Sequence, residues 1–170
     1  MKTDGSDIDL IALIHKQYRE AAEEAVRRGL RYVLKDILGR FLLQIKRYEP
    51  WASREAIAKA GEYAIDLSRV KIHDCNVKDA VALSPEQRKL FADHNRPTEF
   101  HLEHDPPTLQ VVDSILKDEA VSGEKIAEKL ERYRLCFVTR DENKRLDAKG
   151  YHSKRPPAAY EECGIEAEKL

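Results

Sequence analysis

Apolar residues recur at spacings of three and four along the first third of the chain, and this periodicity predicts helices. A first helix is expected over residues 7–28, where Gly29 offers a C-cap, and a second, more apolar helix over 30–47. Ser53 is a good N-cap for a third helix over 53–67. The apolar stripes of these three helices are expected to form a core or a dimer interface.

The polar and apolar pattern changes in the second half of the chain. Ser84-Pro85-Glu86-Gln87 is typical of a helix start, and that helix is expected to run to about Asp93. Beyond it, a short alternating stretch predicts a strand, which Asp105-Pro106-Pro107 stops because proline cannot continue a ladder. The predicted elements are a strand over 98–104, helices over 108–119 and 122–132, a strand over 133–138 and a helix over 140–148.

This order of elements predicts an α+β fold that is mostly helical. Residues 1–97 are expected to form a helical region for dimerisation or nucleic-acid binding. Residues 98–170 are expected to form a small strand–insertion–strand–helix core with a helical insertion over 108–132 and a basic tail. The two insertion helices supply the return that an antiparallel pairing of the two strands needs.

Composition restricts the class of protein. The chain has 170 residues, of which 36% are charged and 42% hydrophobic, as in a globular protein of one domain or one domain with an extension. No apolar run approaches the roughly 20 residues of a membrane span, so no membrane partner is expected. The N-terminus shows no apolar signal region, and three widely spaced cysteines, Cys75, Cys136 and Cys163, fit a reducing compartment. A cytoplasmic location is therefore expected.

The net charge is only −1, but its distribution is uneven. Residues 27–47 are rich in arginine and lysine, and a second basic stretch follows Asn143. Phosphate contacts need such local positive charge more than a positive total. The predicted nucleic-acid contacts nearest the candidate site are Arg140, Lys144 and Arg145.

Candidate chemistry gathers at the two predicted strands. Glu103 and His104 close the first strand, and Asn143 lies in the first turn of the helix after the second. A carboxylate and an amide oxygen suit Mg²⁺, which takes oxygen ligands and keeps several waters. An imidazole can take a proton from an attacking water near neutral pH. These residues therefore predict a metal site with Glu103 and Asn143 as ligands and His104 as general base.

The stretch from Glu99 to Gly150 resembles the HNH, or ββα-metal (His-Me finger), nucleases. The resemblance rests on Glu103-His104 followed by Pro106, then a strand, then Asn143 on a helix. It implies an endonuclease that uses Mg²⁺, or another divalent cation such as Mn²⁺, to hydrolyse phosphodiester bonds in nucleic acid, with DNA favoured over RNA. A homodimer is a further expectation. The chain departs from the family in its long insertion, in the missing middle asparagine and in the absence of zinc-binding cysteine pairs.

Other interpretations of the same residues remain open. The alternative function is a non-enzymatic helical protein that binds a partner protein or nucleic acid as a regulator. His101 shares a strand face with Glu103 and could assist it, although a half-exposed strand residue is the simpler expectation. The run His73-Asp74-Cys75-Asn76 is too tight for one convergent metal site and is expected to form a turn.

Overall fold

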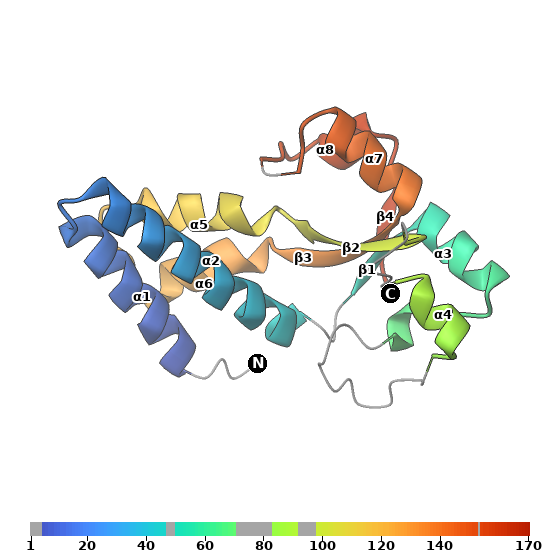
Figure 1. Cartoon of the computed structure of the whole chain (residues 1–170), viewed down its shortest axis with the longest axis horizontal. Helices are drawn as coiled ribbons and strands as arrows, with labels where there is room; N and C mark the ends of the chain where they lie inside the picture. The colour runs from blue at the N-terminus through green and yellow to red at the C-terminus, as the bar shows by residue number, and fades with distance from the viewer. Residues whose placement is uncertain (1–4, 47–49, 71–82, 92–97, 153) are drawn as a thin grey trace.

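The computed structural model describes residues 5–46, 50–70, 83–91, 98–152 and 154–170 (Figure 1). In chain order the elements are α1 (Gly5–Glu20), α2 (Glu24–Lys46), β1 (Trp51–Ser53), α3 (Arg54–Glu62), η1 (Leu67–Arg69), α4 (Pro85–Lys89), β2 (Phe100–Asp105), α5 (Thr108–Leu116), α6 (Gly123–Glu131), β3 (Arg134–Thr139), α7 (Arg140–Ala148), α8 (Ala159–Glu162) and β4 (Ala167–Lys169). The predicted α+β, mostly helical fold is confirmed.

The strand–insertion–strand–helix frame is present. β2 and β3 pair antiparallel, with Phe100 opposite Thr139 and Asp105 opposite Arg134. The helices α5 and α6 fill the connection between them, and α7 starts directly at the end of β3. The helix α7 contacts both strands of this pair. The predicted antiparallel return is thus confirmed.

The sheet draws its strands from both sides of the predicted boundary at residue 97. Its strand order is β2-β3-β1-β4, with β1 parallel to β3 and antiparallel to β4. The three-residue strands β1 and β4 were not predicted, because three residues are too few to show an alternating pattern. The N-terminal region therefore contributes a strand to the sheet in addition to its helices.

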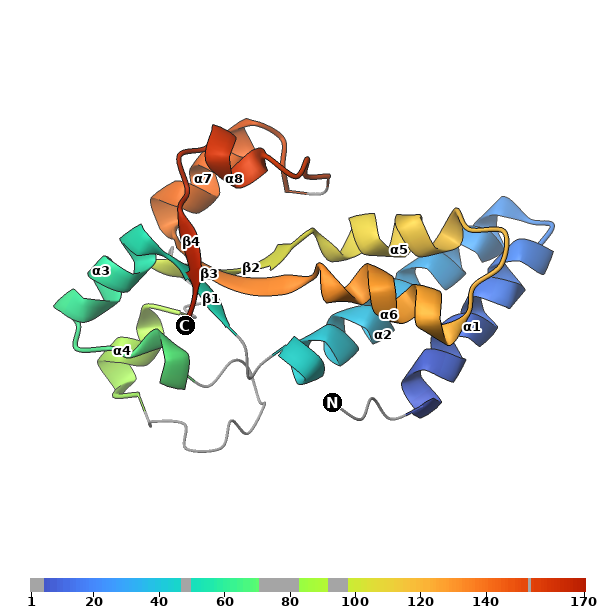
Figure 2. The ribbon, with the colours of Figure 1, turned by 180° about the vertical axis from the view of Figure 1, so that it is seen from behind.

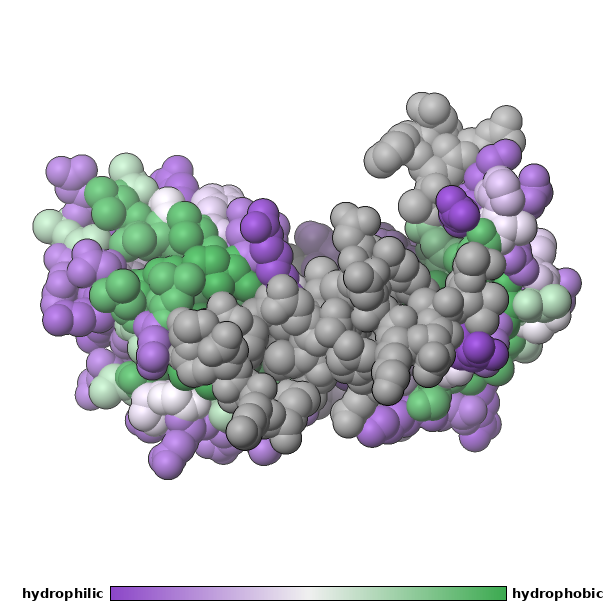
Figure 3. Space-filling model, turned by 90° about the horizontal axis from the view of Figure 1, so that it is seen from below, coloured by the Kyte–Doolittle hydropathy of each residue, from purple (hydrophilic) through white to green (hydrophobic). Residues whose placement is uncertain are grey.

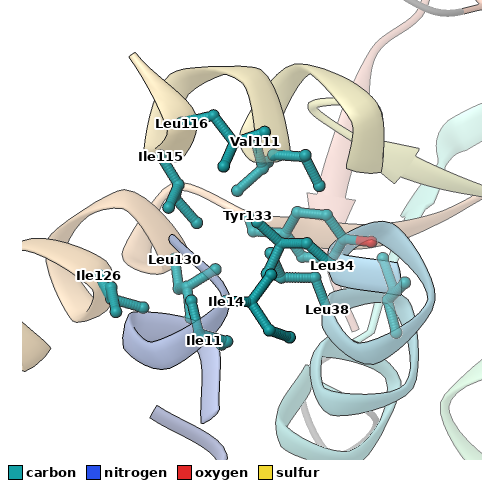
Figure 4. Packing of buried hydrophobic residues seen from close by; sticks show 12 residues of the cluster. Ile11, Ile14, Leu34, Leu38, Val111, Ile115, Leu116, Ile126, Leu130 and Tyr133 are labelled. Atoms are coloured by element: carbon teal, nitrogen blue, oxygen red, sulfur yellow. The ribbon is translucent and has the colours of Figure 1, made fainter. Parts of the chain in front are cut away.

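The helical half of the molecule has its own apolar core. The helices α1, α2, α5 and α6 converge on a cluster that reaches the start of β3 at Tyr133 and Leu135 (Figures 1 and 4). The cluster includes Ile11, Ile14, Leu34, Leu38, Val112, Ile115 and Ile126. The insertion thus packs on the N-terminal helices, and burial of this apolar area holds the two together.

The sheet separates two further clusters. Ala52, Phe100 and Phe137 pack on one face with α3 and η1, while Cys136 and Val138 pack on the other with α7 and α8. Successive residues of β3 alternate between the faces, as a pleated strand requires. The view from behind shows α7 and α8 on one side of the sheet and α3 and α4 on the other (Figure 2).

The first helix boundary was predicted wrongly. The break falls at residues 21–23, and Gly29 lies within α2 instead of ending a helix. The Arg27 Nε donates a hydrogen bond of 2.8 Å to the carbonyl of Ala21, which caps the end of α1. The hairpin made by this break lets the apolar stripes of α1 and α2 face the same core.

The predicted helix starts at Ser53 and Ser84 are confirmed. Ser53 accepts a hydrogen bond from the backbone of Ala56, and Ser84 forms a complete capping box with Gln87. Both helices end earlier than predicted, at Glu62 and Lys89. After α3 the chain turns sharply at Ala64, whose φ of 53° is left-handed and stops the helix.

Several large apolar side chains remain exposed on the first two helices. They are Leu10, Leu13, Val26, Tyr32 and Val33, and an apolar patch is visible over this part of the molecule from below (Figure 3). Within the described part of the chain, no helix combines the length and the apolar character needed to cross a membrane.

The junction of β3 and α7 carries a second capping box. The hydroxyl of Thr139 accepts from the backbone of Glu142, and the buried carboxylate of Glu142 accepts from the backbone of Thr139 at 2.7 Å and from Ser53 Oγ at 2.5 Å. This arrangement fixes the entry of α7 onto the sheet.

We expect Thr139→Ala to lower the free energy of unfolding by about 0.5–2 kcal/mol, the usual cost of losing an N-cap. Chemical denaturation measures this change in the free energy of unfolding. Ser84→Ala is the matched control, since Ser84 caps the exposed five-residue helix α4 and its loss should cost less. An equal or larger effect of Ser84→Ala would contradict this account of the β3–α7 junction.

Candidate functional site

The alternation of β2 places Glu103 and His104 on opposite faces of the sheet. Glu103 lies opposite Cys136, which belongs to the cluster beneath α7 and α8. His104 lies opposite Leu135, which belongs to the helical core. The strand continues to Asp105, so the two side chains do not converge as they could at a frayed strand end.

The carboxylate of Glu103 is held by two basic side chains on the α7 side of the sheet. Arg155 Nη2 donates to Glu103 Oε2 at 2.6 Å, and His101 Nε2 lies 3.0 Å from Glu103 Oε1. The side chain of Glu103 is 13% exposed and that of Arg155 only 1%. His101 is half exposed, so this face of β2 offers solvent an imidazole next to a carboxylate.

These contacts shift the pKa values of the pair in opposite directions. Burial alone would raise the pKa of Glu103, but hydrogen bonds from His101 and Arg155 bring it below its ordinary value. The hydrogen bond to Glu103 raises the pKa of His101, with a smaller contribution from the charge of Asp147. Glu103 is therefore ionised at neutral pH, and His101 holds a proton to a higher pH than a free histidine.

Asn143 lies on the helix that covers this face. It is half-buried in α7, one turn before Asp147 and on the same side of the helix. The charge of Asp147 contributes to the raised pKa of His101. The helix α7, which carries Asn143, contacts β2, the strand that carries Glu103.

The surroundings of His104 are different. Its Nδ1 hydrogen-bonds the hydroxyl of Tyr133, and the hydroxyl of Thr108 lies 3.5 Å from the same nitrogen. Burial raises the pKa of Tyr133, so that hydroxyl stays protonated. His104 thus links the end of β2 to the first turn of α5. The predicted role of His104 as general base stays a prediction, and His101 becomes a second candidate.

The three predicted phosphate contacts lie along α7 and differ in their surroundings. Arg140 is exposed at the helix start, and Lys144 is an exposed residue paired with Asp141 at 2.8 Å. Arg145 donates to the carbonyl of Cys163 at 3.0 Å and to Glu55 at 3.2 Å, which ties α7 to α8 and α3. The structure leaves Arg140 and Lys144 available on the surface and gives Arg145 a packing role.

The donor chemistry on this face is compatible with a hard divalent cation. A carboxylate offers about four lone-pair sites, and two of those on Glu103 are taken by Arg155 and His101. The amide oxygen of Asn143 on α7 is a donor of the type that hard divalent cations accept. Over the described residues, no group of three or more His, Cys, Asp or Glu side chains is arranged to hold a metal ion. The run His73-Asp74-Cys75-Asn76 lies outside those residues.

Two residues of this face were missed in the sequence. The sequence places Arg155 in a basic tail. Nothing in the neighbouring residues predicts that its side chain is buried against Glu103. Asp147 sits four residues after Asn143, and this helical spacing is the signal that could have placed both on one side of the helix.

No protein-family model matches the chain, and neither a curated protein nor a solved structure is significantly similar to it. The resemblance to the ββα-metal nucleases therefore stays a prediction.

Proposed function

We propose that the chain is a divalent-metal-dependent endonuclease that hydrolyses phosphodiester bonds in nucleic acid, with DNA favoured over RNA. The observation that carries the proposal is the arrangement of His101 and Glu103 on the face of an antiparallel strand pair that α7 covers. A half-exposed imidazole, a carboxylate and an amide-bearing helix on one side of a sheet are the parts that such a reaction needs.

Each residue has a defined role in this proposal. Glu103 and Asn143 hold the cation, which when bound supplies positive charge for the phosphate and the leaving oxygen. His101, on the face of Glu103, takes the proton from the attacking water when its imidazole is neutral, and His104 remains the other candidate for this role. Arg140 and Lys144 contact phosphates that flank the scissile bond.

The direct test is nicking of a supercoiled plasmid by the purified chain. We expect nicking in Mg²⁺ or Mn²⁺, no nicking in EDTA, and recovery when the cation is added back. Single-stranded DNA and RNA of matched sequence, assayed alongside, establish the substrate preference. Absence of cation-dependent cleavage of all three substrates would contradict the proposal.

One observation favours the alternative of a non-enzymatic regulator. The ion pair between Arg155 and Glu103 is almost fully buried and satisfies both oxygens of the carboxylate together with His101. A carboxylate of this kind can hold the tail to the sheet without any metal. In that case the chain would cleave no nucleic acid in any divalent cation, and Glu103→Gln would change only its stability.

A cytoplasmic location is part of the proposal. The described cysteines, Cys136 and Cys163, are both free and buried, which suits a reducing compartment. Burial raises the pKa of Cys136 to about 12, so its thiol is unreactive and serves as a small apolar side chain.

A further inference from the structure

A cavity of about 630 Å³ opens at the end of the β2–β3 pair that lies away from the start of α7. Its walls come from the ends of the two strands at Asp105 and Arg134, from Arg132 after α6, and from Trp51 at the start of β1. The tail closes it with Arg155 and the prolines that follow. The volume falls in the range of about 300–1,000 Å³ that is usual for small-ligand sites.

The lining of the cavity carries an excess of positive charge. Four cationic side chains stand against two acidic ones, Asp105 and Glu131. The cationic residues are Arg132, Arg134, Arg155 and Lys169. Asp105 is already engaged, since Arg134 Nε donates to it at 2.6 Å. Arg132 is exposed, and within the described residues no ion pair holds it.

Arg155 adds a second observation. Its Nε and Nη1 are buried and have no hydrogen-bond acceptor among the described residues, while Nη2 is bonded to Glu103. Buried donors without acceptors are unfavourable, so negative charge in the neighbouring cavity would stabilise this guanidinium through space, without a direct contact. The carboxylate of Asp105 is 3.7 Å from Nη1, beyond a hydrogen bond.

Aromatic rings accompany these charges. The guanidinium of Arg134 lies 4.8 Å from the ring centre of Trp51 and 4.9 Å from that of Tyr160. Such stacking holds Arg134 in place, and Trp51 remains half-buried at the wall of the cavity. A ligand that carries both an anion and a flat ring matches this combination of arginines and tryptophan.

We propose that this cavity binds a nucleotide unit, with its phosphate on Arg132 and Arg134 and its base beside Trp51. This inference rests on the proposed function in one respect: the nucleotide unit would belong to the nucleic-acid strand next to the cleaved bond. The link is Arg155, which lines the cavity and also holds Glu103. Binding itself requires no cleavage and no metal.

Trp51 makes the test simple, because it is the single tryptophan of the chain. We expect deoxyadenosine monophosphate, titrated in EDTA, to change the fluorescence of Trp51 in a saturable way. Inorganic phosphate should compete with it, and deoxyadenosine without phosphate should bind at least about tenfold more weakly, because it lacks the charge-assisted contacts. Rising salt should weaken binding of the nucleotide. A 5′-phosphorylated dinucleotide that binds more tightly than the free nucleotide would identify a strand as the source.

Arg132→Gln is the matched variant, since Arg132 is exposed and its loss leaves the ion pairs of the fold intact. We expect its affinity for deoxyadenosine monophosphate to fall about tenfold. Arg69→Gln makes the same charge change at an exposed position outside the cavity and should leave affinity within twofold.

No saturable signal, equal affinity for the nucleoside, or equal effects of the two variants would overturn the proposal. Nucleotide binding without plasmid nicking would contradict the nuclease alone, and nicking without binding would contradict the cavity alone.

Discussion

Glu103→Gln is expected to lower metal-dependent nicking by about 100-fold or more. A bound cation contributes several kcal/mol to such a reaction, and each 1.4 kcal/mol is a factor of ten in rate. The glutamine keeps an oxygen for Arg155 Nη2 but loses the negative charge that a cation requires. The measurement is the rate of plasmid nicking in Mg²⁺ at matched protein concentration, with circular dichroism as the check on folding.

The matched control is Glu99→Gln, which makes the same change one residue before β2. Glu99 is partly exposed, and among the residues that the structure describes its carboxylate pairs with Lys59 alone, at 3.7 Å. Its loss should leave nicking within twofold. Asn143→Ala should lower nicking about tenfold, as expected for a weaker neutral ligand. Equal rates for Glu103→Gln and Glu99→Gln would contradict the assignment of Glu103 as a ligand.

Arg155→Met is expected to lower the free energy of unfolding by about 3–5 kcal/mol, the usual cost of breaking a buried ion pair from one side. The change leaves the carboxylate of Glu103 nearly buried, with His101 as its remaining basic partner among the described residues. It also removes the guanidinium that lies 5.4 Å from the ring centre of Tyr160, which holds the tail against α8. Urea denaturation, with the slope compared between variants, measures the loss.

Two further variants separate the ion pair from general effects on the tail. Lys154→Met changes the preceding, exposed residue and should stay within about 0.5 kcal/mol of the parent chain. The double variant Glu103→Gln/Arg155→Met should regain part of the lost stability, because it leaves no unpaired buried charge. A cost below 1 kcal/mol for Arg155→Met would contradict the buried contact between Arg155 and Glu103.

Much of the fold followed from local signals in the sequence. The strands around Leu102 and Phe137 and the helix after Thr139 were predicted with small errors, because alternation and capping residues act over a few neighbours. The two short strands at Trp51 and Ala167 were missed, because their pairing is decided by residues far along the chain. The break after Glu20 also depends on a side chain, Arg27, that caps from the next helix.

The candidate site was predictable only in part. The helix that carries Asn143 does contact the strand that carries Glu103, as the order of elements indicated, and the shared metal site stays a prediction. The sequence places Glu103 and His104 together, but residues that are adjacent in a strand point to opposite faces when the strand continues past both. The carboxylate of Glu103 contacts His101, two residues before it, and Arg155 in the tail. The sequence indicates only the contact with His101, because residues two apart in a strand share a face.

The central claim is that cleavage occurs on the face of β2 that α7 covers. The most direct test compares His101→Gln with His104→Gln in the plasmid-nicking assay with Mg²⁺. We expect a loss of about 100-fold or more for His101→Gln, the usual contribution of a general base, and less than about fivefold for His104→Gln. Full activity of His101→Gln together with loss of activity in His104→Gln would contradict it and place the reaction on the opposite face.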